Sequence, residues 1–426
     1  MPEVGDMWGI ITDHNGGVWI TQYAGKGSVS PGGTILPGGT GYLLSFNESN
    51  DMFSSINIPG ISSFPMRITV DPRNRLWFTE FLGNKIGEYD PSTKRLTEYP
   101  VPTNDSGPAD LTFDKKGVLW FTEAYSQKVA RFDIDTHLFT EYNLSADIPS
   151  RIVSSPVGIS VDSNGIVWVA DHGGNWIVAF DPTTGNEIHY PTHTPPEEVY
   201  PISIPNGLLI DKTERIWFSE HGGNSIGYVS SDRRTMVEYA IPTGPISTPL
   251  WIALAPSGDV WFAEWSSNKI GVVHGDLPIP MNVQTETPNL TVQTGNTISI
   301  AVVADVAQAL SGNATWDSAW SSYSPRDVRV DFLPSSLSLG TTGVRNVEAR
   351  LEVSTRVDPG NYTLSLGVNQ GSVRVSSMID VRVEASTGYG IDRYLPYALL
   401  ILIVAGLLTI LLFFRRRRPN SKLKPL

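Results

Sequence analysis

The chain has 426 residues and a formal net charge of −12, with 39 Gly, 31 Pro, 12 Trp and only 17% charged residues. A chain of this length contains about two to three folded units, and its turn-forming and aromatic residues favour an all-β fold. The absence of Cys excludes disulfides, thiolate metal sites and a cysteine nucleophile. Residues 415–426 carry six basic residues and no acid, which leaves −18 on the remainder and argues against nucleic-acid binding.

Residues 1–277 contain a repeated pattern that predicts a β-propeller. In one copy, Arg67–Asp71, Leu76–Glu80, Asn84–Asp90 and Leu96–Pro100 are four short segments typical of strands separated by turns. The Trp of the second segment recurs at spacings of 58, 43, 48, 49 and 44 residues, a period typical of propellers rather than helical solenoids. Six copies are marked by Trp19, Trp77, Trp120, Trp168, Trp217 and Trp261.

The sixth copy leaves the number of blades open. Its strands are predicted at Trp251–Leu254, Val260–Glu264 and Lys269–Val273, and the outer Thr-Glu-Tyr strand of the other copies is missing. Residues 1–17 have neither the basic nor the apolar region of a signal peptide, so we expect an exported protein of this kind to have further N-terminal residues. Closure with six blades and closure with a seventh, upstream blade are both compatible with this pattern.

Residues 278–288 are predicted as a Pro-containing linker, and residues 289–386 as an immunoglobulin-like β-sandwich that serves as a stalk. The prediction rests on six segments in which apolar and polar residues alternate. These segments are Leu290–Val292, Thr297–Val303, Val328–Phe332, Val347–Val353, Tyr362–Val368 and Met378–Val383.

Residues 394–414 predict one transmembrane helix. The 21 residues carry no charge and as a helix would span about 31 Å, enough for a hydrocarbon core. Arg415–Arg418 follow directly and indicate that the tail, residues 415–426, faces the cytoplasm. We therefore expect a single-pass protein of the cell membrane with propeller and sandwich outside. Six Asn-x-Ser/Thr sequons all lie on that outward side.

The residues that end the second strands are candidates for a site, because they lie at the same mouth of the central channel as the beginnings of the first strands. They are Gln22, Glu80, Glu123, Asp171, Glu220 and Glu264. Like charges repel, and a bound Ca²⁺ or Mg²⁺ would relieve that repulsion; Asp171, Glu220 and Glu264 are the candidate ligands. The alternative is that each acid accepts hydrogen bonds from its own loop, and its recurrence in every blade favours this structural role.

Two copies place a His after the acid, at His172 and His221, and these are the candidate catalytic residues. An ordinary loop position is the alternative for both. Long insertions at residues 25–41, 145–156 and 192–205 fall on the same mouth and favour a binding face there. The candidate ligand-facing residues are Gln22, Glu80, Glu123, Trp251 and Trp265.

The patterns Trp77-Phe-Thr-Glu80 with Asn84-Lys-Ile-Gly87, and Trp261-Phe-Ala-Glu264 with Asn268-Lys-Ile-Gly271, resemble the streptogramin (virginiamycin B) lyase family over roughly residues 8–275. This resemblance implies a seven-bladed propeller that linearises a cyclic depsipeptide by elimination. It further implies a divalent cation held by carboxylates and a catalytic His in a Pro-His-Gly-Ile motif. In place of that His, the five matching first-strand openings of this chain carry Met66, Ala109, Val157, Asn206 and Leu250.

None of these five side chains can act as a general base near neutral pH. We therefore expect a membrane-anchored, extracytoplasmic propeller that binds a peptide, glycan or protein partner at its loop-rich mouth without lyase activity. The alternative is a metal-dependent lyase or lactone hydrolase that uses Asp171, His172, Glu220 and His221. A purely structural role in a cell-surface layer is a third possibility.

Overall fold

A computed structural model of the chain describes residues 5–24, 38–48, 50–60, 62–144, 154–193, 203–244, 247–309, 312–321 and 327–386. The predicted transmembrane helix at 394–414 and the tail at 415–426 lie outside these ranges, as does most of each predicted insertion at 25–41, 145–156 and 192–205. Within the described ranges, no helix is long and apolar enough to span a bilayer.

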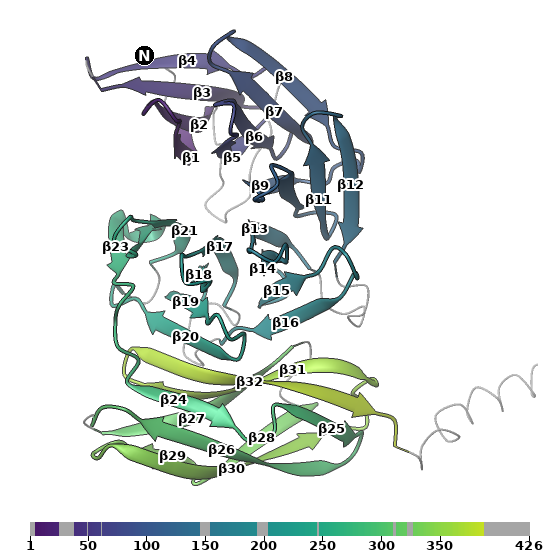
Figure 1. Ribbon diagram of the computed structural model, residues 1–426, viewed down its shortest axis with the longest axis vertical. Coiled ribbons are helices and arrows are strands. Elements are labelled where there is room, and N and C mark those ends of the chain that lie inside the picture. Colours follow the sequence, from purple (N-terminus) through teal and green to yellow (C-terminus); the bar gives the residue numbers. More distant parts are fainter. Residues whose placement is uncertain are drawn as a thin grey trace, which may run out of the picture.

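The described residues contain six successive propeller blades, which confirms the predicted all-β repeat (Figure 1). Each strand pairs antiparallel with the next, and the first strands of successive blades pack against one another around the central channel. Figure 1 shows the blades following each other along an arc, with β1 to β4 at one end and β21 to β23 at the other. Among the described residues blade six has three strands, as the missing Thr-Glu-Tyr segment predicts.

The strand bounds follow the repeat closely. Blade one contains β1 (Gly5–Thr12), β2 (Val18–Ala24), β3 (Thr40–Asn47) and β4 (Met52–Asn57); blade two contains β5 (Pro65–Val70), β6 (Leu76–Glu80), β7 (Lys85–Asp90) and β8 (Arg95–Pro100). Blade three contains β9 (Pro108–Phe113), β10 (Leu119–Glu123), β11 (Lys128–Asp133) and β12 (Leu138–Asn143); blade four contains β13 (Pro156–Val161), β14 (Val167–Asp171), β15 (Trp176–Phe180) and β16 (Glu187–Pro191). Blade five contains β17 (Pro205–Ile210), β18 (Ile216–Glu220), β19 (Ser225–Val229) and β20 (Thr235–Ala240); blade six contains β21 (Pro249–Leu254), β22 (Val260–Glu264) and β23 (Lys269–Val273).

The second strands of blades two to five are buried along their whole length, because a neighbouring blade covers each face. The Trp of each second strand is also held by the turn before it. In blade two, the indole N–H of Trp77 donates to Asp71 Oδ2 at 3.1 Å, and the same bond occurs in blades one, three, four and five. Blade six has Ala255 at the position of this Asp. The recurring Trp is therefore a packing residue in the first five blades.

Residues 281–384 form two further sheets around one hydrophobic core. Each of the six predicted segments lies within an observed strand. Residues 281–285, inside the segment predicted as a linker, are instead a strand, because Met281 and Val283 are buried in the core while Asn282 and Gln284 face solvent. One sheet has the order β24 (Met281–Thr285), β26 (Thr297–Val306), β30 (Gly343–Val353) and β28 (Val328–Leu333). The other contains β32 (Val373–Glu384), β31 (Gly360–Gln370), β27 (Asn313–Trp320) and β29 (Ser336–Ser338), with β25 (Asn289–Gln293) parallel to β32.

The two-sheet unit is joined to the propeller edge to edge. Strand β32 pairs antiparallel with β20, the outer strand of blade five, from Thr235 opposite Ser377 to Tyr239 opposite Val373. One nine-stranded sheet therefore runs from the central channel into the C-terminal unit, and β20 and β32 lie side by side in Figure 1. This paired arrangement differs from the expected stalk on a linker.

Candidate functional site

The channel mouth is the end of the propeller where first strands begin and second strands end. The same backbone hydrogen bond recurs there in blades two to six: the residue after the second strand donates its N–H to the carbonyl of the residue before the first strand. These bonds, of 2.9 to 3.2 Å, join Phe81 to Phe64, Ala124 to Gly107, His172 to Ser155, His221 to Ile204 and Trp265 to Thr248. The residue that follows each strand-ending acid is thus held at an equivalent place on the mouth.

The backbone at these points is strained. Ile204 and Thr248, each directly before a first strand, have φ of 56° and 55°. Left-handed backbone is uncommon for β-branched residues and costs energy. Such strain concentrates at functional sites, where the surrounding structure fixes it. Both residues accept the recurring hydrogen bond of the mouth, which holds them in this conformation.

The side chains that pack at the mouth are those next to the predicted acids. Phe81 and Ala124 form one buried cluster with Met66, Ala109 and Val157 of the first strands. Successive residues at a strand end point to opposite sides, so the acids turn the other way. The cluster contains three of the five side chains that replace the His of the Pro-His-Gly-Ile motif, which makes this part of the lining apolar.

Glu80 and Glu123 turn into their own blades, beside a second Glu of the outer strand. Burial, together with the nearby Glu98, raises the pKa of Glu80 to about 8. Burial and Glu141 raise the pKa of Glu123 to about 7, and its Oε2 accepts a hydrogen bond from Ser126 Oγ at 2.9 Å. Both side chains are buried in this structure, and their contact with a ligand stays a prediction.

Asp171 is occupied by its own loop. Its Oδ1 accepts N–H bonds from Ser155 at 2.7 Å, Gly174 at 2.9 Å and Gly173 at 3.2 Å, and its Oδ2 accepts the indole N–H of Trp176 at 3.1 Å. These bonds match the alternative in which the acid accepts hydrogen bonds from its loop, the role that its recurrence in every blade favours.

Glu220, Gln22 and Glu264 are also buried. Glu220 is fully buried, accepts a hydrogen bond from Ser225 Oγ, and has its pKa raised well above the ordinary value by burial and by Glu238. Gln22 donates to the carbonyl of Gly5 at 3.4 Å, and Glu264 is buried at the end of β22. No three His, Asp or Glu side chains in the described ranges are arranged to hold a metal ion. The described residues therefore do not fit a cation held by a carboxylate ring.

His172 and His221 do converge. Their ring centroids are 5.7 Å apart with the planes at 50°, and they come from the neighbouring blades four and five. Burial, together with His221, lowers the pKa of His172 to about 4, and burial lowers the pKa of His221. Both imidazoles are thus neutral near pH 7 and can accept a proton or a hydrogen bond from a ligand.

A charged cluster that sequence reasoning missed joins three blades. Arg67 of β5 places its guanidinium over the ring of Trp251 of β21, 4.2 Å from the centroid, and its Nε lies 3.1 Å from Asp110 Oδ1 of β9. Trp251, predicted to face a ligand, is half-buried under this cation. The sequence does contain a sign of this cluster. The third position of the first-strand motif is Gly in blades four and five, whereas blades two, three and six have Arg67, Asp110 and Trp251 there.

Asn206 occupies the His position of the motif in blade five, two residues after the strained Ile204. Its side chain is buried, and its Oδ1 has no hydrogen-bond partner in the described part of the chain. Burying an amide oxygen without a hydrogen-bond partner costs free energy. A hydrogen-bond donor on a ligand would recover that free energy by binding to this oxygen. On the outer rim, Trp265 and Tyr125 are 55% and 62% exposed; that Trp265 faces a ligand stays a prediction.

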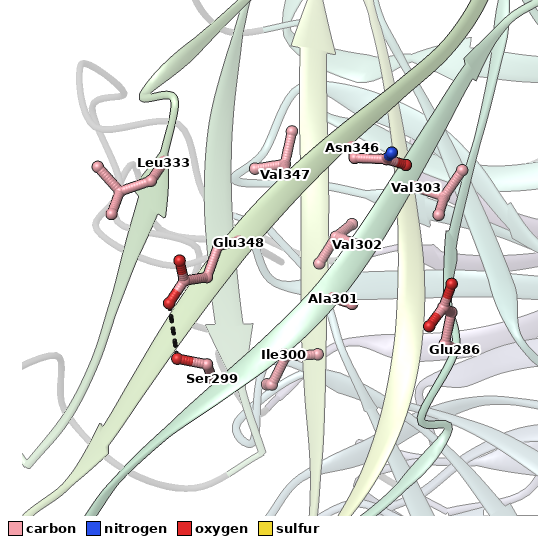
Figure 2. Close-up of a pocket in the computed structure, with 10 residues that line it drawn as sticks. All are labelled: Glu286, Ser299, Ile300, Ala301, Val302, Val303, Leu333, Asn346, Val347 and Glu348. Carbon is pink, nitrogen blue, oxygen red and sulfur yellow. Dashed lines mark hydrogen bonds between the residues drawn. The ribbon is translucent and has the colours of Figure 1, made fainter.

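A separate cavity of about 610 Å³ lies on the outer face of the C-terminal unit, far from these residues in sequence. Figure 2 shows it over β26 and β30, where Ser299 Oγ donates to Glu348 Oε1 at 2.7 Å. Its lining mixes aliphatic side chains with Glu286, Asn346 and Glu348. It contains none of the predicted site residues.

Known proteins resemble the propeller part. A profile of the virginiamycin B lyase family matches residues 46–305. The structure of a catalytically inactive virginiamycin B lyase from Staphylococcus aureus with quinupristin is 26% identical, with a TM-score of 0.54 over 65% of this chain and 83% of that one. A streptogramin B lyase structure is 27% identical, with a TM-score of 0.54 over 65% and 82% of the two chains. No curated protein sequence matches this chain.

Proposed function

The chain belongs to the virginiamycin B lyase family, and on that premise we propose that it is a non-catalytic member that binds a peptide ligand with aromatic side chains at its channel mouth. The observation that carries the proposal is the lining of the mouth. Met66, Ala109 and Val157 pack there into an apolar cluster, and none of them can remove a proton.

The chemistry of the mouth supports the ligand class. Trp265 and Tyr125 offer exposed aromatic faces, His172 and His221 offer neutral imidazole nitrogens, and Asn206 offers a carbonyl oxygen that lacks a partner. Aromatic stacking combined with a few placed acceptors suits a peptide that has both rings and amide N–H groups. A related protein carries quinupristin in its structure, which makes this cyclic peptide a sensible first probe.

The test is calorimetric titration of the purified full-length chain with quinupristin, followed by mass spectrometry of the ligand. We expect saturable binding, an unchanged ligand mass with no linear product, and a loss of affinity of about tenfold in Trp265→Ala. Phe53→Ala, which removes an exposed ring from β4 away from the mouth, is the matched control and should bind normally. Absence of binding in the unaltered protein would overturn the proposal.

A second candidate function is supported by the convergence of His172 and His221. Two neutral imidazoles with ring centroids 5.7 Å apart are suited to general-base chemistry. A lyase or lactone hydrolase of this kind would give a product of changed structure in the same mass-spectrometric assay. Product formation with Mg²⁺ or Ca²⁺ that disappears in His172→Ala and His221→Ala would establish this alternative instead.

We also propose that the protein is anchored in the cell membrane by residues 394–414, with the propeller outside and an immunoglobulin-like C-terminal unit beside it. The uncharged segment followed by Arg415–Arg418 supports this orientation. Fractionation of expressing cells tests it: the full chain should remain with membranes after a high-salt wash, and a chain ending at residue 390 should be released. Release of both chains would exclude the anchor.

A further inference from the structure

His221 is held on the channel mouth by hydrogen bonds that begin in the neighbouring blade. Its N–H donates to the carbonyl of Ile204 at 3.0 Å. The side-chain Oδ1 of Asn175 in turn accepts the N–H of Ile204 at 3.1 Å and the Oγ–H of Ser203 at 2.7 Å. Asn175 ends the loop that carries His172, so both imidazole-bearing loops meet at this amide. The position of one His is therefore tied to the position of the other.

Further hydrogen bonds connect this amide to the C-terminal unit. Thr192 Oγ1 donates to the backbone carbonyl of Asn175 at 2.9 Å. The next residue, His193, donates its N–H to Glu238 Oε1 at 3.1 Å, and Arg374 of β32 donates to the other oxygen of Glu238. Thr192, Glu238 and Arg374 are all buried, so water competes little for these bonds. A chain of contacts thus runs from the C-terminal unit to both His loops.

The same support occurs between blades two and three, with a cation of the propeller itself. Thr103 donates its N–H to Glu141 Oε1 at 3.0 Å, as His193 does to Glu238. Lys128 pairs with the other oxygen of Glu141 at 3.0 Å. Blade five has a Ser in place of this Lys, and the cation there comes from the C-terminal unit. A recurring support of the mouth therefore depends, in the blade that carries His221, on a second folded unit.

We propose that Arg374 is a positioning residue for the His172–His221 pair, which makes the C-terminal unit a part of the ligand site at the channel mouth. This role rests on the proposed function, because the pair lies in that same site. Arg374 acts through Glu238. Without its cation, a buried carboxylate takes up a proton or moves toward water. Either change weakens the hydrogen bond that Glu238 accepts from the backbone, and so loosens the chain of contacts that holds the two His loops together.

The experiment follows the imidazoles in ¹H–¹³C spectra of the purified full-length chain, with no ligand added. We expect Arg374→Met to raise the pKa of His172 from about 4 toward 6.5, because the loosened pair admits water to the ring. Arg374→Lys keeps a cation beside the carboxylate and should preserve the low pKa. Lys128→Met breaks the equivalent pair of blade three and should leave His172 unchanged. Val381→Ala, a buried change in the core of the C-terminal unit, controls for a general loss of stability.

An unchanged titration of His172 in folded Arg374→Met, or an equal change in Val381→Ala, would overturn the proposal. If Arg374→Met does not fold, Glu238→Asp takes its place. This variant keeps the charge but shortens the side chain, which then no longer reaches both Arg374 and the N–H of the loop. The pKa of His172 should again rise, and a normal titration would exclude the role of Arg374. Because no ligand is used, a failure to bind quinupristin would overturn the proposed function alone.

Discussion

Arg374 of β32 forms a buried ion pair with Glu238 of β20, a residue 136 positions earlier in the chain. In blade three the equivalent acid is paired with Lys128 of its own blade, but blade five has Ser225 at that position. Arg374 also donates to Asp317 of β27 at 2.8 Å. The C-terminal unit therefore supplies the cation that blade five lacks, in addition to the strand pairing between the two units.

We predict that Arg374→Met destabilises the protein by about 3–5 kcal/mol, because it leaves the buried Glu238 and the partly buried Asp317 without their cation. Lys128→Met breaks a pair whose side chains are 21% and 18% exposed, and it should cost about 1 kcal/mol or less. Urea denaturation followed by tryptophan fluorescence compares the two. Adding Glu238→Gln to Arg374→Met should recover part of the loss, and equal losses in the two single variants would contradict this role for Arg374.

The pKa of Glu80 predicts that stability depends on pH. Burial and Glu98 raise it to about 8 from an ordinary value of 4.5, so between these values the folded state holds a proton that the unfolded chain releases. The contribution is complete below about pH 4.5 and is lost as the pH rises through 8. Glu80→Gln should therefore stabilise the protein at pH 8, on the order of a few kcal/mol, and have little effect at pH 4.5. Thermal melts at both pH values test this, with the exposed change Glu352→Gln as the control.

The strand-ending acids show what the sequence could predict. The repeat located Glu80, Glu123 and Glu220 at the correct strand ends, because the turn and Trp spacing recur in every blade. It did not settle which side of the strand each acid faces. The partners that decide this, Glu98 for Glu80 and Arg374 for the Glu238 beside Glu220, lie on strands whose pairing depends on the assembled fold.

The repeat pattern likewise could not predict that His172 and His221 lie close together. Their two loops are 49 residues apart and meet only because blades four and five are neighbours. By contrast, the Arg67 cluster was accessible from sequence, since a charged residue at a position that is Gly in other blades is a local departure from the repeat. The open outer edge of blade six could also be predicted from the sequence, because the pattern lacks a fourth strand there.

His172 predicts a second pH dependence, of the opposite sign. Burial and His221 lower its pKa to about 4 from 6.5, so the folded state binds fewer protons than the unfolded chain. Its stabilising contribution is present above pH 6.5 and is lost as the pH falls toward 4. His172→Gln should flatten the stability profile in this window. In ¹H–¹³C spectra, His221→Ala should raise the pKa of His172; titration of His172 near 6.5 in the unaltered protein would contradict the buried pair.

The Arg67 cluster predicts energetic coupling across the channel. Asp110 is buried, accepts the N–H of Ile159 at 3.3 Å as well as the Arg67 guanidinium, and so depends on a cation from the neighbouring blade. Arg67→Met keeps an unbranched stem beside Trp251 and removes the charge, which should destabilise the protein by about 3 kcal/mol. Asp110→Asn should cost less in the Arg67→Met background than in the unaltered protein, because the buried charge is then already unpaired.

A double-mutant cycle by urea denaturation measures this coupling, and Arg73 with Asp135 provides the comparison. That pair has the same chemistry at 2.8 Å, but its side chains are 59% and 64% exposed, so its coupling should be below about 1 kcal/mol. We expect the Arg67–Asp110 coupling to be at least twice as large, since water screens it less. Equal coupling in the two pairs would mean that the channel is wet around Arg67, and that its contact with Trp251, rather than its charge, holds blades two and six together.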